Sequence, residues 1–306
     1  MIITKFYKLI SAIAKTYFEK SVETVDINFI ELNKDLIQEE AIIPKKIWLY
    51  WEDDEIPNLI KLCYKSIIKQ CNGYEVVLLN RSTILDYIDL PTLSDEIPLA
   101  NKSDLIRLEL LVKYGGIWMD ASVFLTQSMD WILNRIKDHD AFLFYSDECT
   151  LDFSNPIPES WFIVCPKNNK FIIDWRDEFK KCITSLYPKE YYNEIKFNKE
   201  IIQNLTVPDY LLIYISAIVC LRRNKYKILY VSSGSVGHYY NYKYNWNGYA
   251  IASCLLFKNY RHVFIPKLIK FTSSTRKPID FFIKHKIFNP KCVLFKNVQE
   301  FESGVY

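Results

Sequence analysis

The stretch Tyr114-Gly115-Gly116-Ile117-Trp118-Met119-Asp120-Ala121-Ser122 links a predicted helix to a predicted buried strand. Before it, residues 100–113 carry apolar side chains at helical spacing, and Asn101 or Ser103 is suited to cap the start of that helix. The two glycines predict the helix end, because glycine adopts the left-handed conformation at no steric cost. The strand that follows delivers Asp120 at its carboxyl end.

Strands and helices alternate on both sides of this stretch. A buried strand is predicted at 46–51, a helix from Pro57, and a second strand at 74–79. Further strands are predicted at 141–146, 160–165 and 227–232, and further helices at about 169–183 and 208–223. Such alternation is typical of an α/β fold in which helices pack on the faces of a parallel sheet.

The chain divides into three predicted parts. Residues 1–41 form an N-terminal helical extension, residues 42–235 the α/β core, and residues 236–306 an α-rich and irregular C-terminal region near the acceptor or a membrane. The first 20 residues have the spacing of an amphipathic helix, which suits either a membrane interface or packing on the body of the protein. The Tyr- and Asn-rich segment 238–249 is predicted as an ordered loop.

Charge and composition limit the classes of partner. The net charge of +3 over 306 residues gives no basis for nucleic-acid binding. Residues 258–296 nevertheless contain ten Lys or Arg residues and a single acid, Asp280. This segment suits anionic lipid or a diphosphate-linked acceptor, and equally a solvated basic surface.

The sequence favours a cytoplasmic protein, with at most peripheral contact at the inner face of the plasma membrane. No stretch reaches the roughly 18–20 continuous apolar residues of a membrane span, and the N-terminus lacks a signal peptide's pattern. The eight cysteines show no Cys-x-x-Cys pair and several lie in apolar runs, which predicts reduced, mostly buried thiols.

Polar and aromatic residues follow three predicted strands at their carboxyl ends, where α/β sheets bind ligands: 51–54, Asn80 and Asp120. Trp48 and Trp51 lie three apart on one strand and should point to opposite faces, so that one is core and the other is available to stack on a base. A carboxylate such as Asp120 can recruit a divalent cation that stabilises a diphosphate leaving group, although a lone strand-end Asp is often only a turn residue.

Three stretches, 43–51, 100–107 and 114–122, together resemble the capsular polysaccharide synthesis proteins. That family is a branch of the family-32 glycosyltransferases, which carry a DXD-type motif, and a fainter likeness continues through 160–163 and 166–168. The resemblance implies a GT-A fold with a Rossmann-like central mixed sheet flanked by helices. It also implies a nucleotide-sugar donor, with UDP favoured, and retention at the anomeric carbon.

The resemblance also implies roles for individual residues. Trp51 falls where the family and its glucosylating-toxin relatives stack the base, and Trp118 at an aromatic position near the base. Ser103, Asp104 and Arg107 fall where the ribose, the transferred sugar and the phosphates are held. Asp104 and Arg107 join Asp120 as the candidate catalytic residues, although two such residues three apart on a helix can also form a mere surface ion pair.

The motif departs from the family at its second acid. Asp120 is the first acid, but Ser122 stands where many relatives have the acid that ligates the metal. A hydroxyl is a poorer ligand for Mn²⁺ or Mg²⁺ than a carboxylate, so use of a divalent cation stays open. His238 is a candidate helper ligand or an ordinary loop histidine, and Lys267 or Lys270 could replace the charge of the cation.

The function expected from these features is glycosyl transfer from a nucleotide sugar to a lipid-linked saccharide acceptor, in bacterial capsule or surface polysaccharide synthesis. The alternative is a non-catalytic nucleotide- or sugar-binding subunit of a polysaccharide assembly complex, which loss of the second acid would allow. A nucleotidyltransferase is a third option. The sequence identifies no general base.

Overall fold

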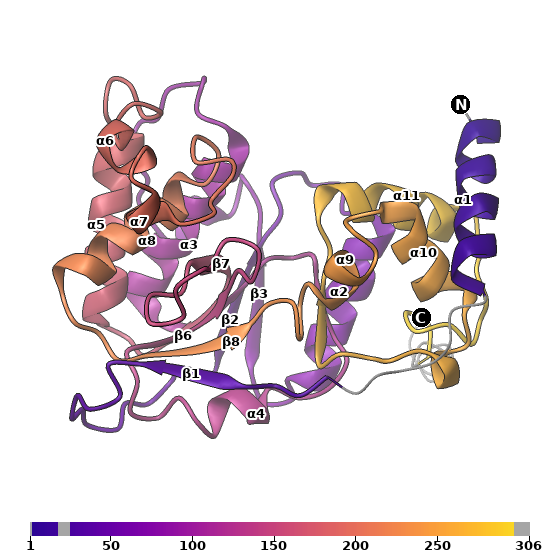
Figure 1. Ribbon diagram of the computed structural model, residues 1–306, viewed down its shortest axis with the longest axis horizontal. Helices are drawn as coiled ribbons and strands as arrows, with labels where there is room; N and C mark the ends of the chain where they lie inside the picture. The colour runs from indigo at the N-terminus through magenta and orange to yellow at the C-terminus, as the bar shows by residue number, and fades with distance from the viewer. Residues whose placement is uncertain (1, 18–24, 297–306) are drawn as a thin grey trace.

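The computed structural model of the protein describes residues 2–17 and 25–296. A seven-stranded sheet in the order β1-β8-β6-β7-β4-β2-β3 forms its centre (Figure 1). The strands are β1 (Phe29–Leu32), β2 (Lys46–Tyr50), β3 (Glu75–Leu79), β4 (Gly116–Met119), β6 (Ala141–Tyr145), β7 (Pro158–Cys165) and β8 (Ile228–Ser232). A second sheet pairs β5 (Val123–Leu125) with β9 (Leu268–Lys270).

The sheet is mixed. Strands β3, β2 and β4 run parallel to one another, as do β6 and β8, while β7 is antiparallel to both β4 and β6 and β1 is antiparallel to β8. The mixed central sheet that the resemblance implied is therefore confirmed. Alternation alone predicted a parallel sheet, which was wrong for β7 and β1.

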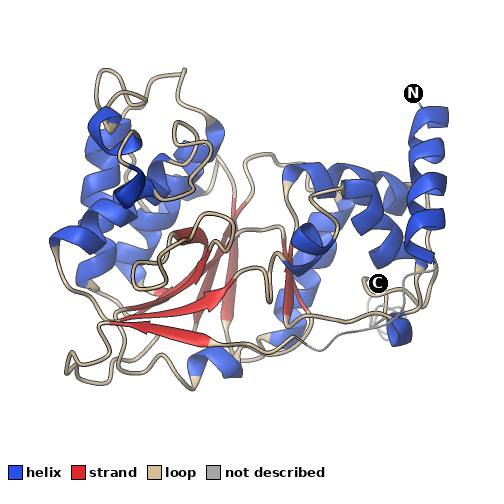
Figure 2. Cartoon of the chain, in the orientation of Figure 1, coloured by secondary structure: helices blue, strands red, loops and turns tan. Residues whose placement is uncertain are grey.

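Helices cover both faces of the sheet (Figure 2). They are α1 (Ile2–Tyr17), α2 (Asn58–Gln70), α3 (Leu99–Tyr114), α4 (Asp130–Leu133), α5 (Lys170–Ile183), α6 (Asn193–Lys196), α7 (Lys199–Ile202), α8 (Leu212–Arg223), α9 (Tyr239–Lys243), α10 (Gly248–Phe257) and α11 (Ser273–Lys284), with 3₁₀ turns at Ile84–Asp86 and Tyr260–His262. Alternate residues of β2 separate two cores: Trp48 packs with residues of α3, α5 and α8, and Ile47 with residues of α2 and α4.

The glycine pair makes the turn that the sequence predicted. Gly115 and Gly116 have φ angles of 65° and 95°, in the region that L side chains rarely adopt. A Cβ atom on Gly115 would lie 2.5 Å from the backbone nitrogen of Lys167, and one on Gly116 2.5 Å from the carbonyl oxygen of Lys46. The turn therefore lets α3 pass directly into β4 against neighbouring backbone.

The start of α3 differs from the prediction. The helix begins at Leu99 with Pro98 as its N-cap residue and no capping side chain, so neither Asn101 nor Ser103 caps it. Proline has no N–H to satisfy and its fixed φ suits the residue just before a helix. As a consequence, Ser103 and Asp104 lie within the helix, where their side chains can face a ligand site.

The N-terminal helix packs on the C-terminal helices, at the end of the molecule remote from α5 and α8 (Figure 1). Leu9 of α1 belongs to one core with residues of α2, α10 and α11, and the Thr16 and Ser253 hydroxyls lie 2.8 Å apart. The packed alternative therefore holds for the described part of this helix, while residues 1 and 18–20 lie outside the described residues. The three domain boundaries stay a prediction.

Two other expectations concern local structure. The segment 238–249, predicted as a loop, contains α9 and the start of α10, so that prediction was wrong. All eight cysteines are free and only Cys149 is not buried, as predicted. Among the described residues, no helix is both long and apolar enough to cross a membrane.

Candidate active site

A cavity of about 760 Å³ opens where β2 and β4 end. Eight of the candidate site residues singled out from the sequence line it, whereas Trp118 and Lys267 do not. The eight are Trp51, Ser103, Asp104, Arg107, Asp120, Ser122, His238 and Lys270. The three matched stretches, which are separate in the sequence, thus meet at one site.

Arg107 connects the two acids of this site. One terminal nitrogen donates to Asp104 Oδ1 at 2.5 Å and to Ser160 Oγ at 2.5 Å, and the other donates to Asp120 Oδ1 at 2.9 Å. The arginine is only 4% exposed. A mere surface ion pair between Asp104 and Arg107 is therefore excluded, because the pair lies inside the cavity wall.

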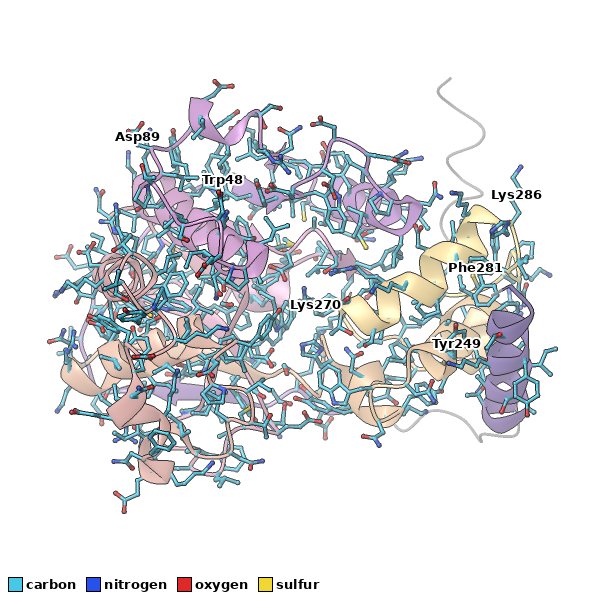
Figure 3. The ribbon with its side chains drawn as sticks, turned by 90° about the horizontal axis from the view of Figure 1, so that it is seen from above. Trp48, Asp89, Tyr249, Lys270, Phe281 and Lys286 are labelled. Carbon is cyan, nitrogen blue, oxygen red and sulfur yellow. The ribbon has the colours of Figure 1, made fainter. Side chains whose placement is uncertain are left out.

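Lys270, the last residue of β9, reaches the same carboxylate from the other side. Its ammonium contacts Asp120 Oδ2 and donates to Ser122 Oγ at 2.9 Å. Figure 3 shows Lys270 between the sheet-bearing body and the C-terminal helices. Asp120 therefore has one cation on each oxygen, Arg107 on Oδ1 and Lys270 on Oδ2.

These neighbours separate the two acids electrostatically. Burial raises the pKa of Asp104 to about 6, with help from the charge of Asp120 and against that of Arg107. Burial would also raise the pKa of Asp120, but the charges of Lys270 and Arg107 outweigh it and lower the pKa to about 2. Asp120 is thus fixed as a carboxylate at neutral pH, whereas Asp104 titrates near neutrality.

The two tryptophans of the matched stretches lie differently. Trp51 lines the cavity, its ring lies 5.5 Å from the Arg276 guanidinium, and its Nε1 has no hydrogen-bond partner in the described residues. Trp48 is fully buried, as the opposite-face prediction required. Trp118 is 1% exposed beneath Arg107 and donates from Nε1 to Asp120 Oδ1 at 3.1 Å, so this position supports the acid rather than meeting a base.

His238 lies in the same cavity but is held by other residues. Its Nδ1 lies 2.7 Å from Asn241 Nδ2, and its Nε2 lies 3.7 Å from Glu159 Oε2. Burial and the charge of Lys270 lower the pKa of His238 to about 3, so the imidazole is neutral at physiological pH.

The residues present do not fit a divalent cation. Mg²⁺ and Mn²⁺ need several oxygen ligands, and carboxylates are the strongest of these. Both oxygens of Asp120 already contact cationic side chains, and no group of three or more His, Cys, Asp or Glu residues within 2–17 and 25–296 could hold a metal ion. His238 and Asp120, the predicted ligands, therefore make no metal site with their neighbours.

Several cavity residues were not found from the sequence: Glu159, Tyr214, Tyr242, Trp246 and Arg276. Glu159 is buried, receives a hydrogen bond from Trp161 Nε1, and has its pKa raised to about 7, chiefly by burial. Its position beside the faint match at 160–163 was the available signal. Arg276 was counted only as one of ten basic residues, which gave no sign that it reaches the cavity.

A curated mannosyltransferase is similar to part of this chain. Inositol phosphoceramide mannosyltransferase 3 of Schizosaccharomyces pombe (strain 972) is 33% identical over 102 residues, which is 31% of this chain and 29% of that protein. The chain therefore spans less than a third of the length of this relative.

Similar solved structures are also glycosyltransferases. The enzyme involved in glycosylation of the PBCV-1 major capsid is 10% identical, with 78% of this chain and 98% of that chain covered and a TM-score of 0.41. Apo GlyE of Streptococcus pneumoniae TIGR4 is 12% identical, with 87% and 65% covered and a TM-score of 0.40. Because these TM-scores are low, the family assignment rests on the sequence match.

The family model described as capsular polysaccharide synthesis protein matches residues 2–192, more than half of the chain. The chain belongs to the capsular polysaccharide synthesis protein family.

Proposed function

We propose that the protein transfers a sugar from a nucleotide-sugar donor to a saccharide acceptor. The observation that carries this proposal is the convergence of the three family-matched stretches on one cavity, with Asp120 held as a carboxylate between Arg107 and Lys270. A donor diphosphate needs positive charge around it, and a cavity walled by buried cations supplies that charge where water is displaced.

The donor is assigned to the side of the cavity that the matched stretches form. Trp51 lines the cavity and offers a ring face to the base, and a UDP-sugar is favoured because the family resemblance implies it. Ser103 and Asp104 face the ribose and the transferred sugar from the first turns of α3. Arg107 and Asp120 complete the catalytic set, and Trp118 acts by holding Asp120 in place.

The acceptor is assigned as a phosphate-bearing or diphosphate-linked lipid saccharide, used in bacterial capsule or surface polysaccharide synthesis with retention at the anomeric carbon. The yeast relative bears the name inositol phosphoceramide mannosyltransferase, which supports an acceptor of this chemistry. The ten basic residues of 258–296 would bring the protein to an anionic membrane surface as a peripheral protein. The charge of two of them is used elsewhere, because Lys270 lines the cavity and Lys267 lies over Trp131.

The test is a screen of nucleotide sugars for hydrolysis or transfer by the purified protein. We expect turnover with at least one donor and a loss of about 100-fold or more in Asp120→Ala, because the variant removes the group that orients two cations. Asp35→Ala, which removes an exposed acid outside the cavity, is the matched control and should keep full turnover. Thermal melting checks that both variants fold, and equal turnover by a folded Asp120→Ala would refute the catalytic assignment.

The same screen separates the alternative of a non-catalytic binding subunit. Such a subunit would bind a nucleotide or sugar saturably and form no product with any donor. Consumption of a nucleoside triphosphate with release of pyrophosphate would instead indicate a nucleotidyltransferase.

A further inference from the structure

Main-chain hydrogen bonds, and not only side-chain contacts, hold Lys270 beside the Asp120-Ala121-Ser122 motif. Strand β9 pairs with β5, which places Lys270 opposite Val123 in the register. The Phe271 amide donates to the Ser122 carbonyl at 2.9 Å, and the Lys270 amide donates to the Gly237 carbonyl at 2.8 Å. This main-chain frame holds the start of the lysine side chain in one position, although 148 residues separate it from Ser122 in the sequence.

The ammonium lies between the first and third residues of the Asp120-Ala121-Ser122 motif. It contacts the Asp120 carboxylate and, at 2.9 Å, the hydroxyl of Ser122, which is 2% exposed. These are the two side chains between which a metal ion would be bound if position 122 carried an acid. The lysine ammonium therefore contacts both motif positions that carry acids in many relatives.

The charges agree with this substitution. The formal charges of two carboxylates and one divalent cation sum to zero, and so do those of one carboxylate and one lysine. Serine at position 122 removes one negative charge from the motif, and Lys270 brings one positive charge instead of two. Burying a charge is costly unless a partner of opposite sign compensates it, so each arrangement is balanced only as a whole.

We propose that Lys270 takes the place of the divalent cation, so that the protein binds the diphosphate of its donor and activates it without metal. This rests on the proposed function. In the transfer, the bond between the anomeric carbon and the diphosphate oxygen breaks and its electron pair stays on the diphosphate. The acceptor hydroxyl oxygen forms the new bond to the anomeric carbon, and its proton ends on the departing diphosphate. Lys270 and Arg276, which both line the cavity, offset the negative charge that develops there.

The first experiment uses the wild-type protein. Binding of UDP, and of GDP and ADP as alternative probes, is measured by calorimetry in EDTA and in Mn²⁺, and Mn²⁺ binding is titrated by electron paramagnetic resonance. We expect the affinity for the preferred nucleotide to agree within about twofold in the two buffers, and no stoichiometric Mn²⁺ site. A nucleotide affinity that collapses in EDTA, or one Mn²⁺ bound per chain, overturns the proposal.

Variants then test the lysine itself. Lys270→Met should weaken nucleotide binding in EDTA by about 50-fold, the usual effect of losing a hydrogen bond to a charged group. Lys267→Met is the matched control, because this lysine lies over Trp131 outside the cavity lining, and it should bind as the wild type does. Lys270→Arg keeps the positive charge, so it should bind nucleotide in EDTA more tightly than Lys270→Met. It supplies a second test of the lysine if Lys270→Met folds poorly. Wild-type affinity in folded Lys270→Met refutes the inference.

The exchange variant Ser122→Asp with Lys270→Met rebuilds the two-acid motif and removes the lysine. We expect it to bind one Mn²⁺ and to bind nucleotide only in the presence of Mn²⁺. An exchange variant that binds no Mn²⁺ counts against the charge equivalence. Because these measurements use nucleoside diphosphates, they succeed or fail independently of turnover, so absent transfer would refute the proposed function while leaving the role of Lys270 standing.

Discussion

The cavity has two walls of different origin. The motif wall consists of Trp51, Ser103, Asp104, Arg107, Asp120 and Ser122, all contributed by the first 122 residues. The closing wall consists of Glu159, His238, Trp246, Lys270 and Arg276, contributed by segments that follow. The first wall is built from short motifs at strand ends and on one helix, whereas the second is assembled from β7, β9, α11 and the connections around α9.

The two walls also differ in how their charges are satisfied. In the motif wall Arg107 binds Asp104, Asp120 and Ser160 at once, so its charge is used within the protein. In the closing wall Arg276 makes no ion pair within the described ranges and lies over the Trp51 ring. The difference indicates that Arg107 holds the motif wall together, while Arg276 of the closing wall keeps its charge available for a ligand.

The largest expected effect separates the two arginines. Arg107→Met should lower the free energy of unfolding by about 3–5 kcal/mol, because it leaves two buried carboxylates without their shared cation. Arg276→Met should change it by less than about 1 kcal/mol, because no ion pair of the described chain is lost, yet should weaken nucleotide binding about tenfold. Urea unfolding and calorimetric titration measure the two quantities. Similar unfolding energies for both variants would mean that the walls do not differ in this way.

The same contrast explains what the sequence revealed. The motif wall could be predicted because each of its residues follows a local signal: Trp51 and Asp120 end apolar strands, and Arg107 shares a helix face with Asp104. Of the closing wall, His238 and Lys270 were singled out but Glu159, Trp246 and Arg276 were not, because the residues of this wall acquire their role through long-range pairing. Lys270 was predicted only as one of two alternatives with Lys267, and the pairing of β9 with β5 is what places it beside Ser122.

The errors in the fold have similar causes. Strand β1 lies within residues 1–41, which were predicted as a helical extension; its four residues pair with β8 at the sheet edge, and Phe29, Ile30 and Leu32 pack against the cores. Helix α9 was predicted as part of a loop because its Tyr- and Asn-rich composition is weak for a helix, whereas the burial of Tyr240 and Asn241 decides its conformation. Tertiary contacts outweighed local propensity in both places.

The next effect concerns two acids, Glu159 of the closing wall and Asp120 of the motif wall, whose pKa values are shifted in opposite directions. The pKa of Glu159 is raised from 4.5 to about 7, first by burial and then by Asp147, against the Trp161 and Ser233 hydrogen bonds and the charge of Lys270. The stability that this acid contributes is therefore present below about pH 4.5 and is lost as the pH rises through 7. The pKa of Asp120 is lowered to about 2, so its contribution is present above its ordinary pKa and is lost only as the pH falls through 2.

As the pH rises from 4.5 to 7, the free energy of unfolding of Glu159→Gln should therefore increase relative to that of the wild type, in total by about 3 kcal/mol. His238, which faces Glu159, does not contribute in this range because its pKa is about 3. Urea unfolding of both proteins at half-unit pH steps measures the difference. A difference that is flat with pH would show that Glu159 is ionised throughout and does not distinguish the closing wall.

The smallest effect contrasts the tryptophans of the two walls. Trp246 has a φ angle of 58° after Asn245 at 45°, two successive left-handed residues that a protein maintains only where the surroundings enforce them. Its ring lies 5.3 Å from that of His238 and its Nε1 donates to Glu148 Oε1 at 2.8 Å. This strained placement puts the Trp246 ring in the cavity lining of the closing wall, separate from Trp51 in the motif wall.

If the motif wall binds the donor and the closing wall the acceptor, the two tryptophans must affect different steps. Trp51→Ala should raise the KM for the nucleotide sugar about tenfold, in line with the loss of one stacking contact. Trp246→Ala should leave hydrolysis of the donor within about twofold and raise the KM for the acceptor by a similar tenfold. Hydrolysis and transfer assayed side by side separate these constants. Were Trp246→Ala to raise the donor KM as strongly as Trp51→Ala does, both rings would serve the same substrate, and the acceptor would have to enter over the α3 side of the cavity instead.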